Sequence, residues 1–229
     1  GTGANAHKLG GETVLFRHEK TLVNQNLFAA TLCSCMSPEE IDTKIAEIKK
    51  VDYDRIGARM YVEALFCSYV GNGVDKYVEL VKKAAAADRA IILECWDVEA
   101  AKAALEVCKD QKPILDGCTL ENWEAMNALA TEAGVTLGLY AENLFDLHDL
   151  VEKLEAAGNK NLVLDCTGKT AKETLANAVL IRRTALKDGD RSFGYPSIVN
   201  LARVAKGDDR LQTAYATMFV EKYGSIIVM

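Results

Sequence analysis

Residues 90–118 read AIILECWDVEAAKAALEVCKDQKPILDGC, and the alternation in this segment predicts the fold. Two short apolar runs, Ala90 to Cys95 and Pro113 to Cys118, enclose a segment of helical periodicity from Val98 to Lys109. A strand, a helix and a second strand in this order are typical of a parallel sheet with crossover helices. This segment therefore predicts an α/β fold.

The same alternation extends outward from this segment through most of the chain. Apolar runs occur at Leu27 to Cys35, Val62 to Cys67, Ala90 to Cys95, Pro113 to Cys118, Val135 to Tyr140, Leu162 to Cys166, Ser192 to Val199 and Ser225 to Met229. Helical segments separate them, starting near Ser37, Asp75, Val98, Leu120, Leu144, Ala171 and Asp209. Eight strands with seven helices between them predict a (β/α)8 TIM barrel that lacks its last helix.

The helix after the first run has the clearest start signal. In Ser37-Pro38-Glu39-Glu40, the serine can cap the helix, the proline suits the first turn and Glu40 can reach back to the cap. Ile41, Ile45 and Ile48 follow at helical spacing, so we expect this face to pack on the core.

The ends of the chain suggest a domain taken from a longer protein. We expect residues 1–26 to form an N-terminal extension that packs on the barrel, with Thr13 to Phe16 as an extra strand at its bottom. Residues 27–229 are the expected barrel domain. Because the first residue is Gly1 and Met229 ends an apolar run without a following helix, we expect further domains in the whole polypeptide.

Composition and charge exclude some classes of function. The chain has 229 residues and a net charge of −6, which disfavours a nucleic-acid partner because such partners bind basic patches. No apolar run is long enough to span a bilayer, so we expect no membrane partner and a cytoplasmic location. The cysteines number 7, an odd count that fits a reducing compartment.

Polar residues that end the apolar runs are the candidate site residues, because active sites of such barrels lie at the C-terminal ends of the strands. The candidates for the mouth of the barrel are Glu94, Asp116, Asn143 and Asp165, with Glu142 as a further carboxylate. Carboxylates there could act as a general acid or base, but they could equally cap the following helix. Catalytic residues remain unassigned.

Other motifs give weaker signals. His7, His18 and His148 lie outside the predicted mouth, so no catalytic histidine is expected. Gly168-Lys169-Thr170 resembles the end of a phosphate-binding loop, but Val163 stands where the first glycine is required.

Cysteines end five of the runs and could supply thiolates to a soft metal. Packing of these small apolar side chains is the favoured interpretation, so no metal site is predicted.

Several segments together resemble the large, gamma-type subunit of the corrinoid iron-sulfur protein. The segments are residues 12–20, ETVLFRHEK; residues 53–57, YDRIG; residues 122–126, NWEAM; residues 162–165, LVLD; residues 181–183, IRR; and residues 191–196, RSFGYP. The resemblance covers the whole chain. Two departures are Asp165-Cys166-Thr167-Gly168, where that family often has Asp-Pro-Gly, and cysteines at positions 95 and 118.

The resemblance implies the middle barrel domain of a protein of the acetyl-CoA pathway of carbon fixation. The full-length protein would bind a corrinoid (cobalamin) and a [4Fe-4S] cluster on other domains, leaving no cofactor on this one. Its implied partners are a small, delta-type barrel subunit, a methyltransferase that uses methyltetrahydropterin, and acetyl-CoA synthase. This domain would then be structural, and surfaces at Arg17 to Lys20 and Arg191 to Tyr195 are expected to contact a partner.

Two alternatives belong to other classes of function. The chain could be a free-standing methyltetrahydropterin-dependent methyltransferase that holds the pterin with Asn143 and the strand-end carboxylates. It could also be a metal-binding barrel that uses its cysteines.

Overall fold

A computed structural model describes residues 1–10, 12–16, 19–22, 24–221 and 223–229 of the chain. The predicted fold class is confirmed: eight strands form a closed barrel in the order β10-β11-β12-β3-β6-β7-β8-β9. These strands are β3 (Leu27–Cys33), β6 (Ala64–Ser68), β7 (Ala90–Glu94), β8 (Ile114–Cys118), β9 (Thr136–Tyr140), β10 (Leu162–Asp165), β11 (Ser197–Asn200) and β12 (Ile226–Val228). Each coincides with one of the predicted apolar runs.

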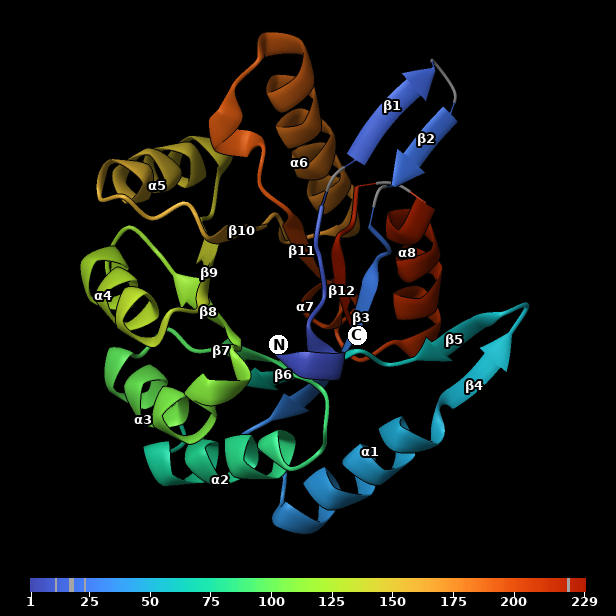
Figure 1. Cartoon of the computed structure of the whole chain (residues 1–229), viewed down its shortest axis with the longest axis vertical. Helices are drawn as coiled ribbons and strands as arrows, with labels where there is room; N and C mark the ends of the chain where they lie inside the picture. The colour runs from blue at the N-terminus through green and yellow to red at the C-terminus, as the bar shows by residue number, and fades with distance from the viewer. Residues whose placement is uncertain (11, 17–18, 23, 222) are drawn as a thin grey trace. The chain divides into compact units, whose positions relative to one another are not determined.

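The helices follow the strands as expected (Figure 1). They are α1 (Pro38–Lys50), α2 (Val74–Ala85), α3 (Val98–Cys108), α4 (Trp123–Ala133), α5 (Leu144–Ala156), α6 (Ala171–Arg183), α7 (Leu201–Ala205) and α8 (Asp209–Glu221). The short helix α7 was not predicted, because five residues are too few to show a helical period. Both α7 and α8 precede β12, the eighth strand of the barrel.

Two compact units make up the chain. The first contains residues 1–6 and 28–138, and the second contains residues 7–27 and 139–229. In the first unit β3, β6, β7 and β8 are neighbours in parallel register. In the second, β10, β11 and β12 pair in parallel.

Residues at the helix ends define where α1 begins and where α4 ends. Ser37 caps α1 in a complete capping box: its side chain accepts from the Glu40 N–H, and the Glu40 carboxylate accepts from the Ser37 N–H at 2.7 Å. Ile41, Ile45 and Ile48 are buried as expected. Gly134 ends α4 in the left-handed conformation, which glycine adopts without steric cost.

The N-terminal extension differs from the prediction in one respect. The expected extra strand exists as β1 (Glu12–Phe16), but it pairs with a second strand, β2 (Glu19–Leu22), in a separate antiparallel sheet. The second strand was missed because EKTL is a polar segment without an apolar run. Packing of residues 1–26 on the barrel, and the boundary at residue 27, stay predictions.

A second hairpin was also missed. Strands β4 (Asp52–Arg55) and β5 (Ala58–Tyr61) pair antiparallel through a turn at Ile56 and Gly57. This hairpin, which we call the β4–β5 ribbon, extends away from α1 (Figure 1). Its strands are exposed and polar, so they carry no apolar alternation that could have revealed them.

Candidate functional site

In the first unit, two of the candidate carboxylates lie on neighbouring strands, Glu94 as the last residue of β7 and Asp116 in the middle of β8. Glu94 closes β7 and is the register partner of Asp116 on β8. Glu94 is buried and accepts a hydrogen bond from the Ser68 hydroxyl at 2.6 Å. Asp116 is also buried, and its Oδ1 accepts from the Gly117 N–H at 3.0 Å. The structure therefore places these two acids side by side on neighbouring strands, and their role as a site stays a prediction.

The backbone around Asp116 is tightly packed. A Cβ atom on Gly138 would lie 2.5 Å from Oδ1 of Asp116, and one on Gly117 would lie 2.5 Å from the Cys95 carbonyl oxygen. Gly117 also has a φ of +112°, which a residue with a side chain rarely adopts. These glycines allow the acids to sit close to the neighbouring strands.

In the second unit, Asp165 forms a buried ion pair. Its side chain is 0% exposed, and its Oδ2 lies 3.1 Å from Nη1 of Arg203. The other oxygen accepts from the Thr167 N–H at 2.9 Å. The Arg203 guanidinium also lies over the Tyr140 ring, 5.0 Å from its centroid, and burial raises the pKa of that tyrosine.

Arg203 was not among the predicted site residues. It stands in helix α7 directly after the seventh strand, and Asn200 caps this helix by accepting from the Arg203 N–H at 3.1 Å. The sequence signal was an asparagine at a strand end followed three residues later by a cation. Because helix α7 was not predicted, this spacing did not identify Arg203 as a site residue.

Asn143 has a structural role. It caps helix α5, where its Oδ1 accepts from the Asp146 N–H at 2.9 Å and its amide donates to the Asp146 carboxylate at 2.7 Å. Neighbouring Glu142 is exposed. Both hydrogen-bonding groups of the Asn143 side chain are thus bonded to Asp146 in the first turn of α5.

The strand-end cysteines mostly pack as apolar side chains. Cys67, Cys95, Cys118 and Cys166 are buried, and so is Cys108 on α3. Burial raises the pKa of each of these thiols, to about 12 for Cys95 and Cys118. Cys33 and Cys35 instead form a disulfide, although free thiols were expected. Among the described residues, no three His, Cys, Asp or Glu side chains are grouped as a metal site would require.

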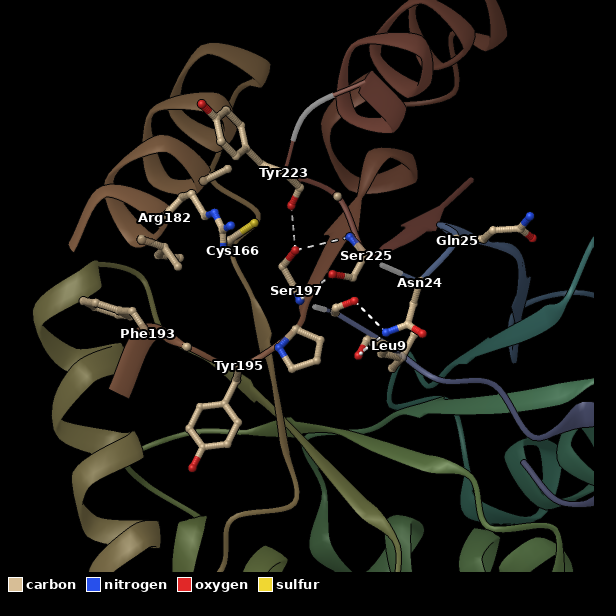
Figure 2. Close-up of a pocket in the computed structure, with 16 residues that line it drawn as sticks. Leu9, Asn24, Gln25, Cys166, Arg182, Phe193, Tyr195, Ser197, Tyr223 and Ser225 are labelled. Carbon is tan, nitrogen blue, oxygen red and sulfur yellow. Dashed lines mark hydrogen bonds between the residues drawn. The ribbon is translucent and has the colours of Figure 1, made fainter. Parts of the chain in front are cut away.

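A small pocket lies at the other ends of the strands in the second unit (Figure 2). Its volume is about 180 Å³. Ser197, the first residue of β11, lines it and donates to the Tyr223 carbonyl at 2.8 Å, while Asn24 donates to the Gly10 carbonyl at 2.7 Å. The N-terminal ends of barrel strands serve stability more often than catalysis, so this pocket is not a candidate active site.

The predicted contact surface at Arg191 to Tyr195 is partly internal. Ser192 and Phe193 are buried, and the Phe193 ring packs on His148 with 5.4 Å between centroids. Tyr195 donates a hydrogen bond to Glu155. This correction leaves Arg191 as the exposed charged side chain of the segment. In the other predicted surface, Arg17 and His18 lie outside the described residues.

His148 lies on α5 and is paired with two carboxylates. Its Nε2 is 2.8 Å from Oδ2 of Asp190, and Nδ1 is 3.7 Å from Oε2 of Glu152. Burial disfavours the charged form of Asp190, but hydrogen bonds from the Ser192 N–H and from His148 outweigh it and lower the pKa of Asp190. His148 therefore links α5 to Asp190 through a hydrogen bond.

None of the described helices is long and apolar enough to cross a membrane. Together, the strand order and the strand-end residues define an α/β barrel whose polar mouth residues are bonded to their own neighbours.

Comparison with known proteins gives the family. The family described as "CO dehydrogenase/acetyl-CoA synthase delta subunit" matches residues 1–229, so the chain belongs to it. The chain is 34% identical over 230 residues to the "Corrinoid/iron-sulfur protein large subunit" of Moorella thermoacetica, with 100% of this chain and 51% of that protein aligned. It is 30% identical over 238 residues to the "Acetyl-CoA decarbonylase/synthase complex subunit gamma" of Archaeoglobus fulgidus, again with 100% and 51% aligned. The chain thus spans about half the length of these relatives.

Solved structures support the fold. Dihydropteroate synthase from Thermus thermophilus is similar with a TM-score of 0.65 and 17% identity, over 93% of this chain and 91% of that one. The enzyme from Xanthomonas albilineans gives a TM-score of 0.60 at 10% identity, over 92% and 90%. At such identities the likeness extends to the fold alone.

Proposed function

We propose that this chain is the barrel part of a corrinoid iron-sulfur protein that carries a methyl group from a methyltetrahydropterin-dependent methyltransferase to acetyl-CoA synthase. The observation that carries the proposal is the alignment of the whole chain with half of a protein named for a corrinoid and an iron-sulfur centre. In this role the barrel is a scaffold that docks other subunits, and it performs no chemistry itself.

The hydrogen bonds that Asp165, Glu94 and Asn143 make to neighbouring residues support a scaffold role. Asp165 is paired with Arg203, Glu94 accepts from Ser68, and Asn143 is engaged with its own helix. A general acid or base must reach a substrate atom, whereas these groups hold loops and helix ends in place. The rival interpretation as a free-standing pterin enzyme is therefore not favoured.

The described residues do not fit the [4Fe-4S] cluster that the relatives' name implies. Such a cluster requires four cysteine thiolates. Here two cysteines share a disulfide, and among the described residues no three Cys, His, Asp or Glu side chains are grouped as metal ligands would be. Pockets of about 180, 300 and 360 Å³ among the described residues are also too small for a corrinoid macrocycle, which is much larger than the drug-sized ligands that occupy roughly 300 Å³ or more. We therefore assign both cofactors to the half of the relatives that this chain does not span.

One experiment separates the carrier from the pterin enzyme. The whole protein is purified anaerobically from its source, and its mass, iron content and ultraviolet-visible spectrum are measured. The carrier has a mass about twice 25.0 kDa, since the chain spans 51% of its relative, with corrinoid and iron-sulfur absorbance. A colourless protein of 25.0 kDa contradicts the proposal.

A methyl-transfer assay completes this test. Whole protein, methyltetrahydrofolate and free cob(I)alamin are mixed without a methyltransferase, and methylcobalamin is measured. The scaffold forms none above background. A pterin enzyme forms it, and loses the activity in Asn143→Asp, which keeps the acceptor that caps α5 but loses the amide donor.

The tip of the β4–β5 ribbon supports the docking role and points to a second subunit as the occupant. Ile56 is 97% exposed there, and Tyr53 and Met60, register partners on one face of the ribbon, are also exposed. On the other face, Arg59 donates to Asp52 at 2.7 Å, so this polar face is internally bonded. Relatives named as a large subunit and as a subunit of a complex are the reason for choosing a protein partner.

The backbone conformation of the turn at the tip of the ribbon also supports a role of Ile56 in docking. Ile56 and Gly57 have φ angles of 50° and 76°, as in the tight hairpin turn that normally carries Asn-Gly. A β-branched residue is strained in this conformation, by about 1–2 kcal/mol. Ile56 therefore lowers the stability of the free protein in two ways, by straining the backbone and by exposing an apolar side chain to water. Burial of this side chain against a partner would remove the second of these penalties.

Ile56→Asn separates docking from stability. Asparagine suits the left-handed turn, so we expect the free energy of unfolding to stay equal or to rise by up to about 1 kcal/mol. Loss of an apolar anchor should weaken binding of the small subunit about tenfold or more, measured by titration calorimetry on the whole protein. Phe145→Asn, at an apolar residue 89% exposed on α5, is the control and should leave binding unchanged. Equal affinity of Ile56→Asn and the parent protein contradicts docking through the ribbon.

A further inference from the structure

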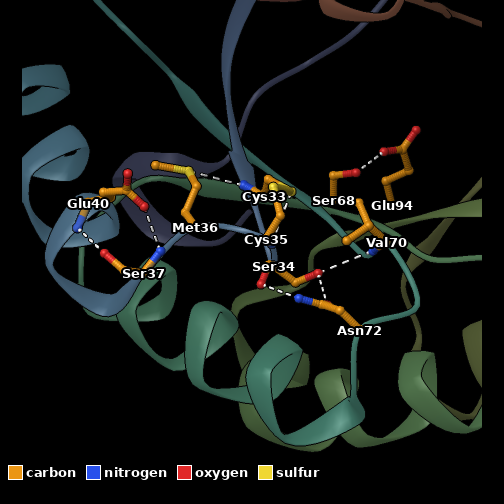
Figure 3. Close-up of a disulfide and its surroundings, with 10 residues drawn as sticks. All are labelled: Cys33, Ser34, Cys35, Met36, Ser37, Glu40, Ser68, Val70, Asn72 and Glu94. Carbon is orange, nitrogen blue, oxygen red and sulfur yellow. Dashed lines mark hydrogen bonds between the residues drawn. A yellow bond between two sulfur atoms is a disulfide. The ribbon is translucent and has the colours of Figure 1, made fainter.

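The Cys33–Cys35 disulfide lies at the C-terminal end of β3, in the first unit (Figure 3). The chain turns directly after β3: Ser34 and Cys35 lie in a turn that the Met36 N–H closes by donating to the Cys33 carbonyl at 3.1 Å. This turn brings the Cα atoms of the two cysteines to 5.1 Å, a separation that a disulfide can bridge. Ser34 is 3% exposed and hydrogen-bonds with Asn72, whereas Cys35 is exposed.

Ser34 anchors the loop independently of the S–S bond. Its hydroxyl donates to Oδ1 of Asn72 at 2.7 Å and accepts from the Val70 N–H at 3.2 Å. The Asn72 amide donates to the Ser34 carbonyl at 2.7 Å, and the Ser34 N–H donates to the Ser68 carbonyl at 2.9 Å. Since these bonds do not involve sulfur, they keep the two cysteines close together when the disulfide is reduced.

The other five cysteines are less reactive toward thiol reagents than this pair. Each is at most 2% exposed, and burial raises the pKa of its thiol. The thiolate is the reacting form of cysteine, and it needs access to its reagent. Only Cys33 and Cys35, among the cysteines of the chain, combine proximity with access.

We propose that Cys33 and Cys35 form a reversible thiol–disulfide exchange site that is reduced by dithiols and re-formed by disulfides. This inference does not depend on the proposed function. It assigns a reaction to a part of the barrel that the methyl-carrier role leaves unused.

Reduction of the disulfide proceeds by two successive thiolate attacks. A thiolate of the dithiol attacks Sγ of the exposed Cys35, the Sγ–Sγ bond breaks, and Cys33 leaves as a thiolate. The Cys35 N–H, which donates to the Cys33 sulfur at 3.1 Å, stabilises this leaving group before it takes a proton. The second thiolate of the reagent then attacks the mixed disulfide and releases Cys35. Two electrons and two protons pass from the dithiol, which becomes a cyclic disulfide.

Site-resolved alkylation tests the proposal on the whole protein, kept native and anaerobic. Samples are treated with dithiothreitol or left untreated, freed of reagent, alkylated with N-ethylmaleimide and quantified residue by residue by mass spectrometry. Treatment should convert both cysteines from unmodified to fully alkylated, at least about tenfold faster than Cys118. Oxidised glutathione added after reduction should restore protection, releasing two glutathione molecules for each pair.

Variants provide the controls. In Cys35→Ser, Cys33 should be alkylated without any reductant, whereas Cys118→Ser should leave the behaviour of the pair unchanged. Full alkylation of both cysteines in the untreated parent overturns the proposal, because no disulfide is then present. Reduction that occurs only after denaturation also overturns it, as does failure of oxidised glutathione to restore protection.

Discussion

Asp165 and Arg203 show how single residues hold the C-terminal ends of strands in the second unit. The carboxylate is fully buried, and it accepts from both the arginine and the Thr167 N–H. Thr167 in turn accepts from the Asn200 N–H at 2.7 Å. A buried charge is costly unless it is paired, so each member of this network depends on the others.

Removal of both partners should therefore cost less than the sum of the two single removals. Arg203→Met leaves Asp165 buried with one partner fewer, and we expect it to lower the free energy of unfolding by about 2–4 kcal/mol. Asp165→Asn should cost about 1–3 kcal/mol, because the arginine is 29% exposed and water can replace its partner. Urea denaturation of the two variants and the double variant gives the coupling energy, expected to be about 1–2 kcal/mol. Strict additivity would contradict the network.

At the scale of elements, helix ends are fixed by local side chains. Ser37, Asp97, Asn143 and Thr170 each accept from a backbone N–H in the first turn of the following helix. These residues stand between a strand and its crossover helix, the part of a βα unit where the chain turns onto the outside of the sheet. The same chemistry accounts for polar residues at the junctions between strands and helices.

Ser37 provides a direct test of this stabilisation. Ser37→Ala removes the acceptor of the Glu40 N–H and should lower the free energy of unfolding by about 1 kcal/mol. Ser37→Asp retains an acceptor and adds a negative charge at the helix start, so its stability should match the parent within about 0.5 kcal/mol. Thermal or urea unfolding measures both. Equal losses in the two variants would show that the cap does not stabilise the fold.

For the whole molecule, stability should depend on pH through its paired carboxylates. Asp190 has a pKa below its usual 3.8 because of hydrogen bonds from the Ser192 N–H and His148. A carboxyl group whose pKa is lowered in the folded state stabilises it above the unfolded pKa, and this contribution is lost as the pH falls through the folded pKa.

Asp190→Asn should isolate this effect. The difference in unfolding free energy between parent and variant should be fully present at pH 5 and above, where Asp190 is ionised in both the folded and the unfolded state, and should shrink as the pH falls below 3.8. Its size should be about 1 kcal/mol or less, since both side chains are partly exposed. Urea denaturation at pH 7, 5 and 3 measures it. A difference that stays constant down to pH 3 would assign the loss to packing.

The alternation of apolar runs with helical segments in the sequence predicted the barrel. Each of the eight strands lies within or next to a run that periodicity identifies, because a strand buried on both faces must be apolar along its whole length. Capping signals likewise placed the start of α1. The exposed β4–β5 ribbon, strand β2 and the short helix α7 left no such signal, since solvent-facing or very short elements do not need a buried face.

Sequence by itself also placed Glu94, Asp116, Asn143 and Asp165 near the ends of strands, and its resemblance to a methyl carrier agrees with the family of the chain. Only the tertiary structure decided what these side chains do. Arg203 lies 38 residues after Asp165, and Ser68 lies 26 residues before Glu94. Local sequence specifies which residues end a strand, but the partner of a buried charge comes from another strand or helix, and the packing of those elements selects it.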